Sequence, residues 1–484
     1  MTITILVVGA ILLTCVLSSK MLYRFGIPTL LIFISLGILL GSEGIGGIYF
    51  DNAQLAAKVC SVGLIFIMFY GGFGVNWKVA KPIAPKAILL ASLGVIATAG
   101  LVGLFAWKVL KFEMLNAMLL GAVISSTDAA SVFSILRSRN LNLKSGLAPL
   151  LEMESGSNDP TSYMLTVIVV SLITGRGSGN VFLMALKQVS FGLVIGFGVA
   201  FLAVFALRRA NLEIDGLYSI LVIGIILFSY GICDYIGGNG YLCVYIIGIV
   251  LSNGKIPHKR SLVHFFDGLT WLMQIVIFFT LGLLLFPSQL PKVMLTGIAV
   301  SVFLSLIARP AAVMAILSFF KVPIKEQVFV SWVGLRGVAS VVFAAYALAN
   351  NVPGADDIFN TVFIISIFSL VVQGTFIPAL AKKLDIIDDN VPTALSFSDY
   401  EDQMHDYLAE YVVYEDNAIA GKTIMDANIP DHVLVVIIKR DKEIIVPKGQ
   451  TKIKVGDILV LGGNDLSQVE EMMKPVEIGE SAAK

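Results

Sequence analysis

The sequence predicts an all-α polytopic membrane protein of about 13 transmembrane helices, followed by a small α+β domain. Of its 484 residues, 57% are hydrophobic and 14% are charged, whereas an average soluble protein has roughly 25% charged residues. The mean hydropathy is +0.87, and long apolar runs extend from residue 3 to about 383. This composition excludes a soluble globular, disordered or nucleic-acid-binding protein as a description of the whole chain.

The formal net charge of zero hides two regions of opposite charge. Residues 1–383 contain 25 Lys/Arg and 14 Asp/Glu, a net charge of +11, and residues 384–484 contain 9 and 20, a net charge of −11. We therefore divide the chain into a membrane domain at 1–383, an acidic linker at 384–409, and a cytoplasmic domain with its tail at 410–484. The four cysteines show no CxxC spacing, so they predict neither a disulfide framework nor a metal site.

Thirteen apolar segments define the predicted helices of the membrane domain. With the N-terminus outside, 17 Lys/Arg fall in the loops on one side and six in the loops on the other, which places the C-terminal domain in the cytoplasm. No basic residue precedes Lys20, so the first segment is predicted to be a span and not a signal peptide. The segments lie near residues 3–19, 26–41, 54–75, 84–107, 115–136, 148–174, 181–207, 217–236, 239–253, 268–287, 292–319, 328–350 and 358–381.

Two of these segments carry interruptions. The fifth contains a polar run from Ser125 to Ser131, and because Ser, Thr and Asp compete for backbone hydrogen bonds, we expect a break there with Asp128 as a cap or a ligand. The alternative is that Asp128 is the N-cap of a short helix at the cytoplasmic edge. The twelfth segment has a Gly-rich interruption from Gly334 to Ser340 that contains Arg336. Paired interruptions of this kind indicate inverted repeats around a site at the membrane midplane.

The sixth segment begins with acidic and amide residues. Ser155 and Asp159 lie four apart and share a face of the predicted helix, and Glu154 and Asn158 form an adjacent pair. Their oxygen atoms suit a hard monovalent cation, and a buried carboxylate can hold a proton instead, which is the simplest physical basis for antiport. The alternative is a solvated acidic loop that ends at Pro160 in the first helical turn.

Two arginines supply positive charge within the predicted spans. Arg309 lies deep in the eleventh segment, and we assign Glu154 as its partner because an unpaired buried charge is strongly destabilising. For Arg309 and Arg336 alike, the alternative is a side chain that snorkels to the membrane surface. The Gly-rich stretches at 70–74 and 237–241 are expected to allow close helix packing.

Residues 1–383 resemble the monovalent cation/proton antiporters of the NhaP-like branch, which includes cell-volume-regulation-type K+/H+ antiporters. The resemblance implies an NhaA-like fold with a dimerisation domain and a mobile core in which broken helices cross. It implies that Asp159 binds the exchanged ion with help from Thr127, Asp128, Ser155 and Asn158, and that Glu154–Arg309 is a structural ion pair with Arg336 as support for a broken helix. It rests on Ser126-Thr127-Asp128, Glu154-Ser155 with Asn158-Asp159, Arg309-Pro310 and Gly334-Leu335-Arg336-Gly337.

The same resemblance implies a homodimer in the lipid of a bacterial inner membrane. The Asn158-Asp159 pair resembles that of electroneutral members, so one cation, K+ in preference to Na+, is expected to exchange for one proton. Some archaeal members place an acidic residue near the position of Tyr70–Phe73, and this chain has none there. An enzyme is not expected, because no nucleophile–base pair or metal-binding cluster is visible.

Two rival functions remain open. A ligand-gated cation channel would need a filter of backbone carbonyls, and no TVGYG-like loop occurs. A sodium-coupled organic-anion symporter could be built on a similar crossed-helix fold.

After residue 411, short β-rich runs between charged turns predict a small α+β domain of about 75–90 residues. Residues 410–472 resemble the TrkA-C (RCK-C) ligand-sensing domain. The resemblance rests on three segments, Gly421–Pro430, Lys439-Arg440-Asp441 and Val455-Gly456-Asp457. The resemblance suggests a dimer and a small-molecule regulator, for instance cyclic di-AMP; the alternative is a passive dimerisation module. No GxGxxG occurs in residues 384–484, so NAD or ATP sensing is not supported, and His405 and His432 are too isolated to indicate a metal site.

Overall fold

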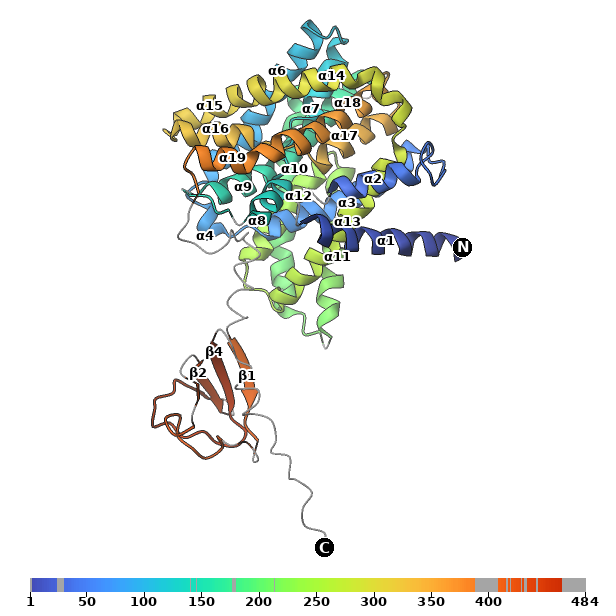
Figure 1. Cartoon of the computed structure of the whole chain (residues 1–484). Coiled ribbons are helices and arrows are strands. Elements are labelled where there is room, and N and C mark those ends of the chain that lie inside the picture. Colours follow the sequence, from blue (N-terminus) through green and yellow to red (C-terminus); the bar gives the residue numbers. More distant parts are fainter. Residues whose placement is uncertain are drawn as a thin grey trace. The chain divides into compact units, whose positions relative to one another are not determined.

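The chain forms two compact units, Met1–Ser396 and Phe397–Lys484. They are seen in a computed structural model (Figure 1). It describes residues 2–23, 30–139, 141–144, 146–175, 180–212, 214–387, 408–414, 417, 419–427, 429–430, 433–440 and 443–463. Most of the predicted acidic linker, the tail from residue 464, His405 and His432 lie outside these residues.

The first unit is built from helices. Three π-helical turns, η1 (Leu90–Gly94), η3 (Leu304–Ala308) and η4 (Ser369–Gln373), join consecutive α-helices, and η2 (Pro287–Gln289) is a 3-10 turn. The α-helices are α1 (Thr2–Tyr23), α2 (Leu30–Leu40), α3 (Ala53–Phe73), α4 (Trp77–Ala80), α5 (Ala84–Leu89), α6 (Val95–Lys108), α7 (Met114–Val123), α8 (Ala129–Ser138), α9 (Leu147–Ile173), α10 (Val181–Arg209), α11 (Asp215–Tyr235), α12 (Gly240–Asn253), α13 (Lys259–Leu284), α14 (Leu290–Phe303), α15 (Arg309–Phe319), α16 (Ile324–Trp332), α17 (Val338–Ala349), α18 (Ala355–Phe368) and α19 (Gly374–Lys383).

The outer surface of this unit is apolar in the way that a lipid environment requires. Large apolar side chains such as Leu202, Leu295 and Phe319 are exposed on its helices. Seven helical segments within the described residues are long and apolar enough to cross a membrane, and shorter apolar helices accompany them. The seven are Ala53–Phe73, Ala84–Lys108, Val181–Arg209, Gly216–Tyr235, Lys259–Leu284, Pro287–Phe319 and Ala355–Lys383.

Two of the predicted segments are interrupted helices whose breaks meet. The chain leaves α7 after Val123 and re-enters a helix at Ala129, and it leaves α16 after Trp332 and re-enters a helix at Val338. The backbone N–H of Asp128 in the first break donates to the carbonyl of Leu335 in the second, at 2.8 Å. Both breaks end earlier than predicted, because α8 already begins at Ala129 and α17 at Val338. At the start of α8, the Asp128 side chain caps the helix by accepting a hydrogen bond from the Ser131 N–H.

Glycine allows the close packing of α3 and α12 that the 70–74 stretch predicts. A Cβ at Gly72 would lie 2.2 Å from the carbonyl oxygen of Tyr245, and a Cβ at Gly248 would lie 2.3 Å from that of Phe69. The two backbones therefore approach one another where a larger residue would separate them.

The second unit contains a four-stranded antiparallel sheet in the order β1-β4-β2-β3. Its strands are β1 (Leu408–Val412), β2 (Val433–Arg440), β3 (Glu443–Ile445) and β4 (Ile458–Gly463). Ile438, Ile453 and Leu459 are fully buried in its core. At the end of β2, Arg440 holds Asp457 by two hydrogen bonds, Nε to Oδ1 at 2.7 Å and Nη2 to Oδ2 at 2.8 Å.

Candidate functional site

The polar residues of the sixth predicted segment lie within α9 and face the interior. Glu154 and Asp159 are 1% and 7% exposed, and Ser155 and Asn158 are also buried. These values contradict the alternative of a solvated acidic loop. Pro160 lies inside the helix and not in its first turn, because α9 already begins at Leu147.

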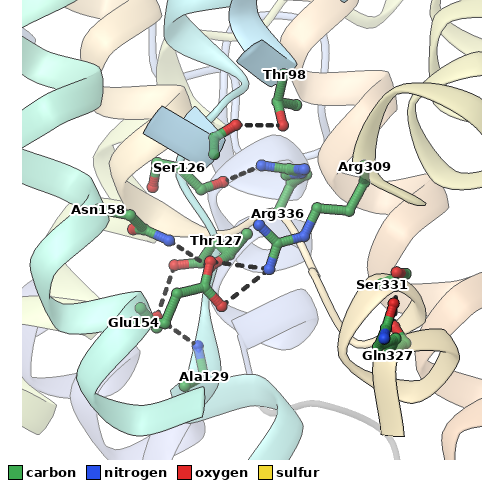
Figure 2. A network of polar contacts seen from close by, with 12 residues as sticks. Thr98, Ser126, Thr127, Ala129, Glu154, Asn158, Arg309, Gln327, Ser331 and Arg336 are labelled. Carbon is green, nitrogen blue, oxygen red and sulfur yellow. Dashed lines mark hydrogen bonds and ion pairs between the residues drawn. The ribbon is translucent and has the colours of Figure 1, made fainter. Parts of the chain in front are cut away.

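Three side chains of α9 contact the break between α7 and α8. The Ser155 hydroxyl donates to the Thr127 carbonyl at 2.7 Å and accepts from the Ala129 N–H at 2.8 Å. Asn158 Nδ2 donates to Thr127 Oγ1, as Figure 2 shows. Asp159 Oδ1 accepts a hydrogen bond from the hydroxyl of Ser126. The structure therefore gathers the predicted residues Thr127, Ser155, Asn158 and Asp159 around one point.

Asp128 lies beside this group and supports both breaks. Its Oδ1 accepts from the Ser131 N–H at 3.3 Å, so it is the N-cap of α8, and its Oδ2 accepts from Ser131 Oγ at 2.6 Å. It also packs directly against the second break, since a Cβ at Gly337 would lie only 2.3 Å from Asp128 Oδ2. Asp128 is half-buried.

The structure also brings Glu154 and Arg309 together. Arg309 Nη2 lies 2.8 Å from Glu154 Oε1 and 2.9 Å from Oε2, and the side chains are 2% and 1% exposed (Figure 2). Arg309 is the first residue of α15, directly after the π-helical turn η3. Gly334 leaves room for the guanidinium, because a Cβ there would lie 2.9 Å from Arg309 Nε.

Arg336 holds the two breaks together and does not snorkel. Its side chain is 1% exposed, and Nη1 donates to the carbonyl of Ser126 at 2.6 Å (Figure 2). Its backbone N–H donates to Ser369 Oγ at 3.0 Å. A buried arginine is a fixed positive charge, and here it stabilises an extended backbone that has no helical partner for its carbonyl.

The hydrogen bond between Ser126 and Asp159 was not predicted from the sequence. Ser126 lies within the predicted polar run, but helical spacing relates α9 residues only to one another and cannot show which residue of the break Asp159 contacts. A second feature is Asn158 Oδ1, which is buried and has no hydrogen-bond partner among the described residues. Carboxylate, hydroxyl and amide oxygens thus converge where half-helices end, an arrangement that suits a cation or a proton.

Comparisons with known proteins agree over most of the chain. A family model described as sodium/hydrogen exchanger, transmembrane, matches residues 8–383, and a TrkA-C domain model matches residues 408–474. The K+/H+ antiporter NhaP of Alkalimonas amylolytica is 35% identical over 464 residues, which cover 95% of this chain and 81% of that protein. The K+/H+ antiporter NhaP2 of Shewanella baltica is 34% identical over 468 residues, with the same coverage of both chains.

The solved structure of the sodium proton antiporter MjNhaP1 from Methanocaldococcus jannaschii at pH 8 has a similar fold. The TM-score is 0.70 at 23% sequence identity, and the match covers 79% of this chain and 99% of that one. The predictions of a helical polytopic transporter-like fold and of a small C-terminal TrkA-C domain are confirmed.

Proposed function

Because the chain belongs to the sodium/hydrogen exchanger family, we propose that it exchanges a monovalent cation for a proton across a membrane, with Asp159 holding each in turn. The observation that supports this most directly is the position of Asp159 beside the crossing of the two broken helices. Within the part of the chain that the structure describes, Arg309 pairs with Glu154, and Arg336 donates to the Ser126 carbonyl. Asp159 is therefore the buried acid left for a mobile ion to neutralise.

K+ is the proposed cation, and Na+ is the alternative. Relatives named K+/H+ antiporters align with 95% of this chain, including both of its compact units. The stretch Tyr70–Phe73 in α3 contains no acidic residue that would add a second carboxylate. Cation preference depends on the number and rigidity of the oxygen ligands, so transport rates must decide between the two ions.

We propose that the exchange is electroneutral. Asn158 next to Asp159 is a neutral amide, and the charge of Glu154 is cancelled by Arg309 at 2.8 Å. Asp128 is held by Ser131 at the start of α8, so among the described residues of the site we assign the exchange to the Asp159 carboxylate, which carries one proton or one monovalent cation. Neither half of the cycle moves a net charge, so a membrane potential should not drive it.

The finer architecture belongs to the same proposal. We propose about thirteen spans in two inverted repeats, with the N-terminus outside, and a mobile core that moves past a dimerisation domain in a bacterial inner membrane. The paired breaks at 124–128 and 333–337 and the 17-to-6 division of loop Lys/Arg support this. We also propose the division into residues 1–383, 384–409 and 410–484, with a cytoplasmic domain that regulates exchange, for which cyclic di-AMP is one candidate ligand. The two compact units support that division.

The test uses full-length protein in proteoliposomes with an internal pH dye at zero membrane potential. Addition of K+ or Na+ should move protons in the wild type and not in Asp159→Asn, which should still purify as a folded protein. Asp51→Asn, at an exposed position before α3, is the matched control. Exchange that survives in Asp159→Asn would refute the assignment. A K+ current without proton movement would favour a channel, and uptake of labelled organic anions would favour a symporter.

A further inference from the structure

Ser126 makes two contacts that fix it at the centre of the site. Its side chain is 2% exposed, and its hydroxyl donates to Asp159 Oδ1. Its carbonyl accepts from Arg336 Nη1 at 2.6 Å, so a buried guanidinium holds its backbone in place. Because this backbone is restrained, it positions the Ser126 hydroxyl against the Asp159 carboxylate.

We propose that Ser126 is a specificity-determining residue for the exchanged cation, and this inference rests on the proposed function of Asp159. A serine hydroxyl has one donor and two acceptor positions, and its hydrogen rotates to suit its surroundings. When Asp159 is empty, the hydroxyl donates to the carboxylate. When a cation binds Asp159 Oδ1, the hydroxyl turns a lone pair toward the cation and becomes one of its oxygen ligands.

Asn158, which precedes Asp159 in α9 and contacts the same break, provides an independent observation. Its Nδ2 is fixed by Thr127, while its Oδ1 is buried and has no hydrogen-bond partner within the described chain. A buried amide oxygen without a partner is costly, and a cation between Asp159, Ser126 and Asn158 would satisfy it. Asn158 and Ser126 thus offer neutral oxygens beside the single charged one, which suits a weakly bound monovalent ion.

The neighbouring serine shows what a purely structural role in this break looks like. Ser125 is 1% exposed, and its hydroxyl donates to the carbonyl of Ala122 at 2.7 Å, which satisfies the end of α7. The two serines are alike in burial and differ in whether the hydroxyl reaches Asp159. Ser125→Ala is therefore the matched control for Ser126→Ala.

The experiment measures initial proton movement against K+ and Na+ concentration in proteoliposomes of full-length protein at fixed pH. Ser126→Ala should raise KM for the cation by about tenfold or more, since a hydrogen bond or ligand to a charged group is lost. The maximal rate should change less than KM, and the ratio of the K+ and Na+ KM values should change. Ser126→Thr, which keeps the hydroxyl, should restore the wild-type KM, and Ser125→Ala should leave it unchanged.

An unchanged KM and ion ratio in Ser126→Ala, or an equal change in Ser125→Ala, would overturn the inference. If Ser126→Ala does not fold, Ser126→Cys takes its place, because a thiol is similar in size to a hydroxyl but is a weak donor and a weak ligand. Ser126→Cys should raise the KM for the cation in the same way. A wild-type KM in this variant would count against the proposal. Asp159→Asn is measured alongside. Exchange in that variant would refute the proposed function itself, whereas an inactive Asp159→Asn with a normal Ser126→Ala would refute only the role of Ser126.

Discussion

Replacing Arg309 by methionine removes the positive charge of the buried ion pair while keeping a long side chain in α15. Glu154 would then remain 1% exposed without its partner, which now contacts both carboxylate oxygens at 2.8 and 2.9 Å. Removing one member of a buried pair typically costs about 3–5 kcal/mol, because the other charge stays desolvated. We expect Arg309→Met to lose stability in this range.

An exposed ion pair in the same unit gives the control. Lys292 Nζ lies 2.9 Å from Asp357 Oδ1, but the side chains are 71% and 43% exposed. Exposed pairs contribute about 0–1 kcal/mol, so Lys292→Met should cost much less than Arg309→Met. The geometry of the two pairs is similar, and the difference between them isolates the effect of burial.

The double variant Glu154→Gln/Arg309→Met tests the physical reason. It removes both charges at once and leaves no desolvated ion, so it should be more stable than Arg309→Met alone. Thermal unfolding in detergent ranks the four proteins, and the proteoliposome assay shows which remain active. The reasoning is refuted if Arg309→Met loses no more stability than Lys292→Met, or if adding Glu154→Gln gives no recovery.

Two further changes test, separately, the contact of the two breaks with one another in the first unit and the Arg440–Asp457 pair in the second unit. Gly337→Ala places a Cβ 2.3 Å from Oδ2 and 2.6 Å from Cβ of Asp128, so the rate of exchange should fall between about tenfold and 100-fold. In the control Gly100→Ala, the added Cβ meets nothing within 4 Å, so this variant should exchange at the wild-type rate. Equal rates in the two variants would contradict this. Burial tends to raise the pKa of Asp457, but hydrogen bonds and charge from Arg440 outweigh it and hold that pKa below its usual value. The pair therefore stabilises the sheet above about pH 4 and loses this effect as the pH falls through the lowered pKa. Asp457→Asn should cost about 1.5–3 kcal/mol near neutral pH and less in acid, measured by hydrogen exchange of β2 and β4; a cost that stays constant on acidification would contradict this sign.

The breaks of the fold could be predicted because their cause is local. Ser, Thr, Asp and Gly weaken a helix wherever they cluster, and both clusters interrupt helices in the structure. Their ends were predicted less well, because Asp128 caps α8 and allows Ser131 to join the helix. The π-helical turns were not predicted; η3 (Leu304–Ala308) lies within a long apolar segment, directly before Arg309 and two residues before Pro310.

The site shows the same division between local and long-range causes. Helical periodicity placed Ser155 and Asp159 on one face, and both contact the first break. The cost of an unpaired buried charge suggested that Arg309 needs Glu154, and the two lie together. The Ser126–Asp159 hydrogen bond depends instead on how a broken helix crosses an intact one, and no spacing within a single segment encodes that crossing.

The charges at the crossing give a reason why the proposed exchange would be coupled. Arg309 and Arg336 carry positive charges, Glu154 is paired with Arg309, and Asp128 accepts two hydrogen bonds from Ser131. With Glu154 and Asp128 counted as carboxylates, the charges of these four groups sum to zero. On the proposed assignment, Asp159 then sets the net charge: zero with a proton or a monovalent cation bound, and −1 when empty. An uncompensated charge is costly in a low-dielectric interior, so on this proposal the core would move readily when Asp159 is loaded and would resist movement when it is empty, which would tie each outward step to an inward one.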